Sequence, residues 1–241
     1  MKVLLTRPKG KNQSMAVALE HHHIPYMITP LLKVLPVSQA EYHTPHPLTQ
    51  VDTVIFVSPN AVKYADALYQ QAWPTHLDYF AVGKATRNAL LNLGIQSITP
   101  QSSQQTTEGL LALPELDAVK NKKILIVRGI GGRASLAQVL EQRQASVSYW
   151  EVYQRLPVDL NAKQITNQWK IAKIDTIIVT SGEILSNLIK LVPKELFSWL
   201  QTCHIIVPSA RVEQLAFQHG LEHVTNAKAA NSAAMISALI N

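Results

Sequence analysis

Hydroxyl and guanidinium side chains recur at or shortly after the ends of short apolar runs in this chain. The positions are Arg7, Ser58, Thr86, Arg128, Ser181 and Ser209. If each run is a strand that leads into a helix, these residues lie where free backbone N–H groups and the positive end of the helix dipole attract anions. A single such hydroxyl would be an ordinary helix cap. The recurrence predicts instead a site that collects several negatively charged groups.

Tyr153 is the candidate for proton transfer. It lies within residues 151–155, a segment that we expect to connect two parts of the chain. A phenol keeps its proton at neutral pH and can donate it to a departing hydroxyl group. An aromatic side chain that packs at a hinge is the alternative, and the sequence leaves both interpretations open.

A glycine-rich segment suggests a different chemistry. Residues 129–134 fit the pattern G-x-G-x-x-A between a predicted strand and a predicted helix, and Glu151 ends the next strand. This pattern is typical of dinucleotide sites, in which glycines let the backbone approach the pyrophosphate. Short patterns of this kind also occur by chance, so a nucleotide-dependent α/β enzyme is the alternative function.

Histidine and cysteine residues predict no metal site. His21, His22 and His23 are adjacent, and neighbouring side chains on a helix point about 100° apart, so the three cannot converge on one ion. Cys203 is the single cysteine of the sequence, which excludes an intramolecular disulfide and a cysteine-based zinc cluster. The sequence also contains neither a G-x-S-x-G elbow nor a Walker A loop.

Short β-branched runs alternate with longer amphipathic segments. Buried strands are predicted at 3–5, 53–57, 79–82, 124–127, 176–179 and 204–207. Helices are predicted at 60–71, 85–93, 133–143, 183–191, 212–218 and 232–240. This alternation predicts an α/β fold of parallel sheets with helices on both faces, which is a three-layer arrangement. Ligands of such sheets bind beyond the carboxyl ends of the strands, where the polar residues above are expected.

An internal repeat predicts two domains of similar design. Residues 52–58 return as 175–181, and residues 2–7 return as 123–128. Proline-punctuated extended segments at about 28–38 and 147–157 are predicted to connect the domains and to lie side by side. We expect a continuous domain at 37–152 and a discontinuous one at 1–34 plus 158–241. A simple division near residue 120 is the less favoured alternative.

Composition narrows the class of protein. The chain has 241 residues, 47% of them hydrophobic, and a net charge of +6. Its basic residues form only short clusters and its aromatic content is 6%, so we expect an anionic small molecule as partner rather than nucleic acid. Apolar runs are too short to cross a membrane. We expect a cytoplasmic, monomeric protein without membrane contact.

The order and spacing of several motifs resemble the uroporphyrinogen-III synthase family over nearly the whole chain. These motifs are Leu5-Thr6-Arg7-Pro8, Phe56-Val57-Ser58-Pro59-Asn60-Ala61-Val62, Ala81-Val82-Gly83-Lys84-Ala85-Thr86, Val127-Arg128-Gly129 with Gly132-Arg133, Val152-Tyr153-Gln154-Arg155 and Thr180-Ser181-Gly182-Glu183. The resemblance implies two α/β domains joined by a two-stranded β ladder, with the N-terminal segment in the C-terminal domain. It also implies cofactor-free cyclisation of the linear tetrapyrrole hydroxymethylbilane, with loss of water and inversion of ring D, to give uroporphyrinogen III.

Residue roles follow from the resemblance position by position. Tyr153 matches a tyrosine proposed to assist departure of the hydroxyl group. Hydroxyl positions that line the family's cleft are matched by Ser58, Thr86, Ser181 and Ser209. We expect Arg7 and Arg128 to contact substrate carboxylates, and we assign Asn60 and Gly129, from the same motifs, to substrate binding. A two-domain protein that closes on an anionic ligand without catalysis is a further alternative.

Overall fold

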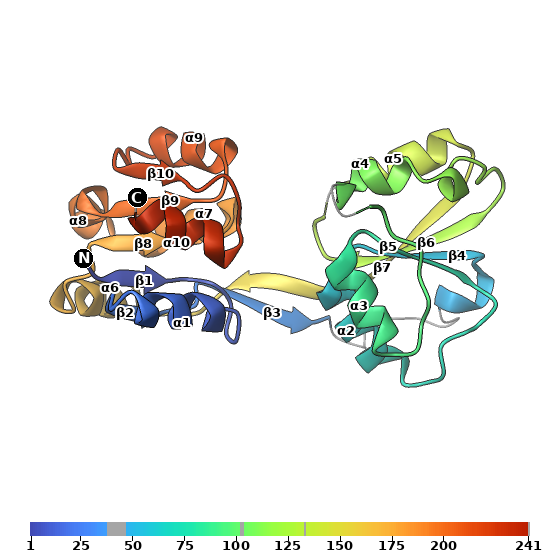
Figure 1. The fold of residues 1–241 in the computed structure, drawn as a ribbon, viewed down its shortest axis with the longest axis horizontal. Helices are drawn as coiled ribbons and strands as arrows, with labels where there is room; N and C mark the ends of the chain where they lie inside the picture. The colour runs from blue at the N-terminus through green and yellow to red at the C-terminus, as the bar shows by residue number, and fades with distance from the viewer. Residues whose placement is uncertain (38–46, 102–103, 133, 241) are drawn as a thin grey trace. The chain divides into compact units, whose positions relative to one another are not determined.

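The structure is a computed structural model that describes residues 1–37, 47–101, 104–132 and 134–240. The chain divides into two compact units (Figure 1). Unit 1 comprises Met1–Lys33 with Leu156–Asn241, and unit 2 comprises Val34–Arg155. Each unit is built on a five-stranded sheet. None of the described helices is long and apolar enough to cross a membrane.

The sheet of unit 2 has the strand order β3-β7-β6-β4-β5. Its strands are β3 (Leu32–Pro36), β4 (Thr53–Phe56), β5 (Asp78–Ala81), β6 (Lys123–Gly129) and β7 (Ser146–Pro157). The helices are α2 (Pro59–Tyr69), α3 (Lys84–Leu91), α4 (Thr107–Leu111) and α5 (Ser135–Gln142), with 3₁₀ turns at Pro47–Gln50 and Pro114–Leu116. Strand β6 pairs in parallel with both β4 and β7, and β4 with β5.

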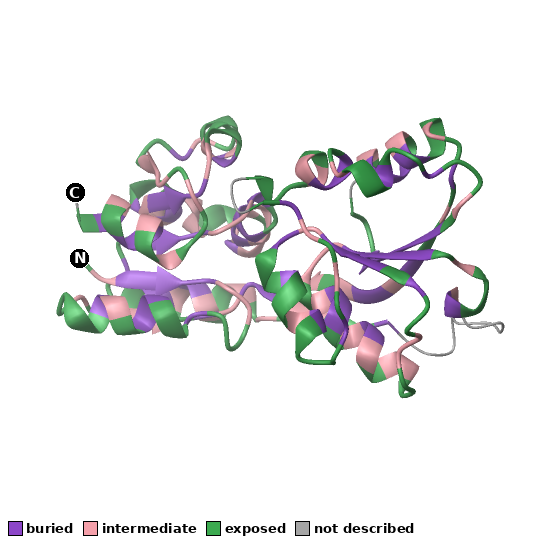
Figure 2. Cartoon of the chain, turned by 45° about the vertical axis from the view of Figure 1, so that its right-hand side comes forward, coloured by how far each residue is buried: buried purple, intermediate pink, exposed green. Residues whose placement is uncertain are grey.

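Alternate residues of these strands enter two separate cores. Val54 and Val127 pack with residues of α2 and α3 on one face, whereas Ile55 and Ile126 pack with α4 and α5 on the other. The strands are buried and the outer helix surfaces are exposed (Figure 2). The predicted three-layer α/β arrangement is therefore confirmed in this unit.

Unit 1 has the strand order β10-β9-β8-β1-β2, with all neighbours parallel. Its strands are β1 (Val3–Leu5), β2 (Tyr26–Ile28), β8 (Thr176–Ile178), β9 (His204–Val207) and β10 (Val224–Asn226). The helices are α1 (Gln13–His21), α6 (Ala162–Ile171), α7 (Gly182–Leu191), α8 (Phe197–Thr202), α9 (Ala210–Gln218) and α10 (Ser232–Ile240), with a 3₁₀ turn at Lys194–Leu196. One face packs against α1 and α10, and the other against α6, α7, α8 and α9. This unit too has three layers.

The sequence repeat corresponds to a repeated strand pair. Asp52, before β4, accepts a hydrogen bond from the backbone N–H of Lys123 at 2.8 Å. Asp175, before β8, accepts one from the N–H of Lys2 at 2.9 Å. The β4–β6 pair of unit 2 therefore matches the β8–β1 pair of unit 1. The order along the chain is permuted, because β1 precedes β8 whereas its counterpart β6 follows β4.

Several elements differ from the sequence predictions. Short edge strands β2 and β10 and helices α6 and α8 were not predicted. The expected connectors overlap β3 and β7, but β7 is also an interior strand, since residues 146–153 pair with β6. Residue 38, the expected end of the first connector, and Arg133, the expected start of a helix, lie outside the described residues.

The two aspartates make a testable contribution to stability. Replacement by alanine removes the acceptor of a strand N–H, so we expect D52A and D175A each to lower the free energy of unfolding by about 1 kcal/mol. Asparagine keeps a carbonyl acceptor, so D52N and D175N should lose less. Urea unfolding measures both, and equal stability of D52A and the wild type would contradict the repeated role.

The contribution of Asp175 depends on pH. Burial alone raises the pKa of Asp175, but hydrogen bonds from the Lys2 N–H and the Thr176 hydroxyl outweigh it and hold the pKa below its usual value. The stabilisation is therefore complete above about pH 4 and is lost as the pH falls through the lowered pKa. The difference in unfolding free energy between wild type and D175A should shrink accordingly.

Candidate functional site

A pocket lies at the carboxyl edge of the sheet of unit 2. Its volume is about 430 Å³, and its lining includes Ser58, Arg128, Gly129 and Tyr153. Four of the predicted site residues are thus brought together by the ends of β4, β6 and β7. This placement is the one expected for the ligand site of a parallel sheet.

Ser58 joins the pocket to the start of α2. Its backbone is extended, with φ −163° and ψ 160°, and its Oγ accepts the N–H of Ala61 at 3.1 Å as a helix cap. The same Oγ lies 3.2 Å from the phenol oxygen of Tyr153, and either atom could be the donor. Because a hydroxyl has two acceptor lone pairs and one hydrogen, Ser58 can cap the helix and still donate to Tyr153.

Tyr153 is held within the pairing of β6 with β7. It is only 6% exposed, and it lies opposite Gly129 because the β6–β7 register shifts between Arg128 and Gly129. A Cβ atom at Gly129 would lie 2.5 Å from Cε2 of the phenol ring, so the ring occupies the space that any other residue would fill. The Tyr153 ring also stacks on that of Tyr64, with 5.8 Å between centroids.

Arg128 places a cation in the pocket that Tyr153 also lines. Its side chain is 8% exposed, its Nε donates to the carbonyl of Gly129 at 3.2 Å, and the same atom lies 3.7 Å from a carboxylate oxygen of Glu151. The guanidinium lies over the ring of Tyr149, 4.7 Å from the centroid. These partners compensate for the burial of the charge.

The glycines of residues 129–132 have a role other than the predicted pyrophosphate approach. A Cβ atom on Gly129 would meet Tyr153, and one on Gly132 would meet the guanidinium of Arg128. The space left by the missing side chains is therefore filled by the protein's own residues. Gly131 has φ +77°, which explains a glycine at this turn.

Two predicted residues of unit 2 do not line this pocket. Thr86 is buried in the first turn of α3 and is 2% exposed. Asn60 is half-buried in the first turn of α2. The N-terminus of α3 is capped from elsewhere, because the Lys84 N–H donates to the side-chain oxygen of Gln105 at 2.9 Å.

The predicted residues of unit 1 lie at the carboxyl edge of its own sheet. Ser181 caps α7 by accepting the N–H of Ile184 at 3.2 Å. Ser209 begins α9 with the same extended backbone, φ −166° and ψ 159°, but its side chain makes no capping bond. Arg7 donates to the carbonyl of Ala230 and to Ser232 Oγ, and burial lowers the pKa of its guanidinium.

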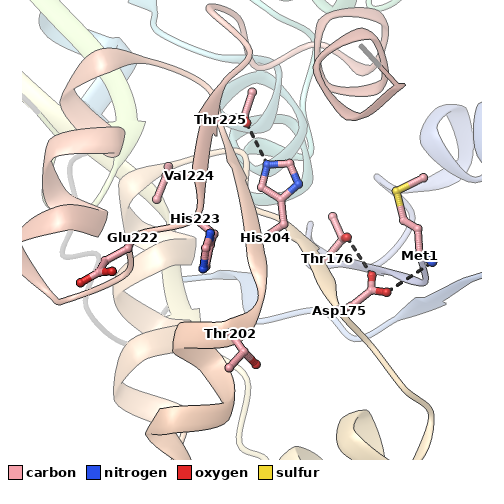
Figure 3. A pocket seen from close by; sticks show the side chains of 9 residues that line it. All are labelled: Met1, Asp175, Thr176, Thr202, His204, Glu222, His223, Val224 and Thr225. Atoms are coloured by element: carbon pink, nitrogen blue, oxygen red, sulfur yellow. Dashed lines mark hydrogen bonds and ion pairs between the residues drawn. The ribbon is translucent and has the colours of Figure 1, made fainter.

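A second pocket lies at the opposite edge of the unit 1 sheet (Figure 3). Its lining includes the carboxylates of Asp175 and Glu222 and the imidazoles of His204 and His223. Burial and the neighbouring His223 lower the pKa of His204, whose Nε2 lies 2.8 Å from Thr225 Oγ1. The two carboxylates of this lining disfavour an anionic ligand. Within the described ranges, no three His, Cys, Asp or Glu side chains gather as a metal site would require.

Sequence reasoning missed several residues of the first pocket. The pocket is also lined by Thr106, Tyr149 and Arg155, and the ring of Tyr64 stacks on that of Tyr153. Thr106 caps α4 by accepting the Gly109 N–H at 3.1 Å, a role that the sequence analysis did not assign to it. Arg155 stood in the quoted motif at 152–155, and alternation along β7 would have placed it on the same side as Tyr153.

Comparison with known proteins gives a consistent family. Residues 13–237 match the uroporphyrinogen-III synthase HemD family. The chain is 32% identical to uroporphyrinogen-III synthase of Escherichia coli strain K12 over 99% of this chain and 100% of that protein. It is 33% identical to the Salmonella typhimurium strain LT2 protein of the same name, with the same coverage of each chain.

Solved structures share the fold. The crystal structure of uroporphyrinogen-III synthetase from Helicobacter pylori 26695 superposes with a TM-score of 0.69 at 14% identity, covering 99% of this chain and 98% of that chain. A mutant uroporphyrinogen III synthase from the extremely thermophilic bacterium Thermus thermophilus gives a TM-score of 0.59 at 13% identity, covering 99% and 97% of the two chains.

The contact between Tyr153 and Gly129 predicts a steric effect. The methyl group of G129A would collide with the phenol ring, so we expect this variant to lose about 1–3 kcal/mol of unfolding free energy. G182A is a matched control, because its Cβ would meet only ordinary contacts, the nearest at 3.6 Å from Arg211. Urea unfolding compares them, and a G129A protein as stable as G182A would refute the contact.

Proposed function

The chain belongs to the uroporphyrinogen-III synthase family, and from this premise we propose that it cyclises hydroxymethylbilane to uroporphyrinogen III. In this reaction the hydroxyl group on ring A leaves as water after protonation, which produces a resonance-stabilised cation. Ring D attacks through its substituted carbon, and the resulting spiro intermediate rearranges and closes with ring D inverted. Without the enzyme the same precursor closes to the isomer without inversion.

The hydroxyl pair of Tyr153 and Ser58 is the observation that carries the proposal. The Tyr153 phenol donates the proton that converts the leaving hydroxyl into water. When that proton leaves, the phenol oxygen faces the Ser58 hydroxyl at 3.2 Å, and Ser58 itself accepts from the N-terminus of α2. A hydrogen-bond donor and the positive end of a helix dipole thus stabilise the developing negative charge.

The charges around the pocket fit an anionic substrate. Among the described residues that line it are Arg128, Arg155 and one acidic side chain, Glu108, and Glu151 lies 3.7 Å from Arg128 outside the lining. The substrate carries several carboxylates, and a guanidinium can bind one through two parallel hydrogen bonds. Thr106 adds a hydroxyl at the start of α4. We assign substrate binding to Arg128, Ser58 and Gly129 on this basis.

Residues outside the pocket complete the proposed binding set. Arg7, Ser181 and Ser209 lie beyond the carboxyl ends of strands in unit 1, each at or near a helix start. The Ser209 hydroxyl makes no capping bond and is the best placed of them for a substrate carboxylate. Asn60 and Thr86 are proposed on the family resemblance alone. A gap shared by both units stays a prediction from the sequence.

The chemistry explains why holding the substrate matters more than a strong nucleophile. The cation forms with modest acid assistance, and the enzyme's main task is to favour attack by the substituted carbon of ring D. Binding the carboxylates at fixed positions restricts the conformations of the linear chain, which selects the geometry that leads to inversion. The alternative function, a protein that binds an anionic ligand without catalysis, would use the same carboxylate-binding groups but would not require the Ser58–Tyr153 pair.

Removal of the Tyr153 hydroxyl tests the proton donor. We expect Y153F to fold normally and to form uroporphyrinogen III about tenfold more slowly, a loss of about 1.4 kcal/mol of transition-state stabilisation. Consumption of hydroxymethylbilane with chromatographic separation of the two product isomers measures the effect. Y79F is the control, because Tyr79 donates to the Pro74 carbonyl away from the pocket. Unchanged turnover in Y153F would remove Tyr153 from the mechanism.

Loss of the Arg128 charge tests carboxylate binding. We expect R128Q to raise KM for hydroxymethylbilane about tenfold while kcat changes little, because uniform binding is lost. R128K keeps the charge without the planar fork and should lose less. Added salt should weaken product binding to the wild type through the exposed charges of the protein and product, which are screened over about 8 Å at physiological ionic strength, whereas the buried Arg128 is screened less. A KM that changes neither in R128Q nor with added salt would contradict the assignment of Arg128 to carboxylate binding.

A further inference from the structure

We propose that Tyr64 is a positioning residue that fixes the orientation of Tyr153 and ties it to the connecting strand β3. This inference rests on the proposed function, because it assigns Tyr64 a role in the step that Tyr153 performs. Tyr64 stands outside every motif that the sequence analysis singled out. Its place in the structure, rather than its sequence context, points to the role.

Helix α2 reaches Tyr153 at two points. Its cap, Ser58, lies 3.2 Å from the phenol oxygen, and Tyr64, further along the same helix, stacks on the phenol ring. The centroids of the two rings are 5.8 Å apart and their planes are inclined by 30°, which is within the range of favourable aromatic pairs. One rigid element therefore supports both the polar end and the face of Tyr153.

The hydroxyl of Tyr64 is anchored in its turn. It donates to the backbone carbonyl of Val34 in β3 at 2.9 Å. Strand β3 pairs with β7, which carries Tyr153, and the Val37 N–H donates to the Val152 carbonyl at 3.2 Å. The contacts form a closed circuit. Tyr153 stacks on Tyr64, Tyr64 bonds to β3, and the residue that follows β3 bonds to Val152, the neighbour of Tyr153 in the chain.

This circuit limits how the phenol can move. The ring already meets the backbone of Gly129, so Tyr64 is the neighbour whose loss would let it tilt. A tilt would carry the hydroxyl away from Ser58 and from the leaving group. Small misplacements of a reacting group can cost large factors in rate. Val34 is also the first residue of unit 2, so the same hydroxyl ties the start of that unit to α2.

Substitutions at Tyr64 separate its two contacts. Y64L removes both the stacking and the anchor, and we expect kcat to fall about tenfold with KM changed less than about twofold. Y64F keeps the ring and loses only the bond to Val34, so kcat should fall about threefold. Y79F loses a tyrosine–carbonyl bond of the same kind and should keep wild-type kinetics.

A double-mutant cycle decides whether Tyr64 acts through Tyr153. In the Y153F background, Y64L and Y64F should each change kcat less than about twofold, because the hydroxyl that they position is already gone. Equal effects in both backgrounds, or no effect of either substitution in the wild type, would overturn the inference. Should Y64L fail to fold, as judged by thermal melting, the Y64F cycle gives the same decision.

Failure of the proposed function would look different. If the wild-type protein does not convert hydroxymethylbilane to uroporphyrinogen III, the proposed function is wrong whatever Tyr64 does. If the wild type is active and Y153F is slow but Tyr64 variants are not, only the positioning role is wrong.

Discussion

The phenol ring of Tyr153 lies against the main chain of Gly129, and the rest of the site depends on this contact. A side chain at position 129 would occupy the space of the ring. The shift in the pairing of β6 with β7 leaves Val152 without a partner in β6 and brings the glycine opposite Tyr153, whose phenol oxygen reaches Ser58 beyond the end of β4. An irregularity in β7 thus determines where this strand holds its polar group, which is a common use of such shifts near functional sites.

The two units share a design but use its equivalent positions differently. Arg7 follows β1, and Arg128 lies near the end of the matching strand β6. The Arg7 guanidinium is engaged by the backbone and a serine around the start of α10, whereas Arg128 is held between Glu151 and Tyr149 in a pocket. The helix caps diverge in a similar way. Ser58 and its counterpart Ser181 both cap their own helices, and Ser58 also reaches Tyr153. The two units therefore share a repeated frame and differ in the contacts of its equivalent residues.

The sequence predicts the frame and the polar ends of its strands better than the contacts among them. Continuous apolar runs followed by Ser58 and Ser181 identify strands that end at helix caps, because both signals are local. The three-residue edge strands β2 and β10 carry too few residues for a periodic pattern. Other features depend on contacts between residues far apart in the chain, so no local sequence signal encodes them. Examples are the burial of Thr86 and the stacking of Tyr64 on Tyr153. The register shift between Arg128 and Gly129 likewise has no local signal in the sequence, because it is defined by the pairing of β6 with β7.

The permuted order of the units has a consequence for synthesis on the ribosome. Unit 2 is a continuous segment, so all of its strands emerge before β8 is translated. Strand β1, in contrast, has β2 beside it from the start but must wait for residues 176–178 to cover its other edge. An uncovered apolar edge invites mispairing with other chains. The nascent protein therefore carries an unfinished amino-terminal half-sheet through most of its translation, and completion of that sheet depends on the last third of the polypeptide.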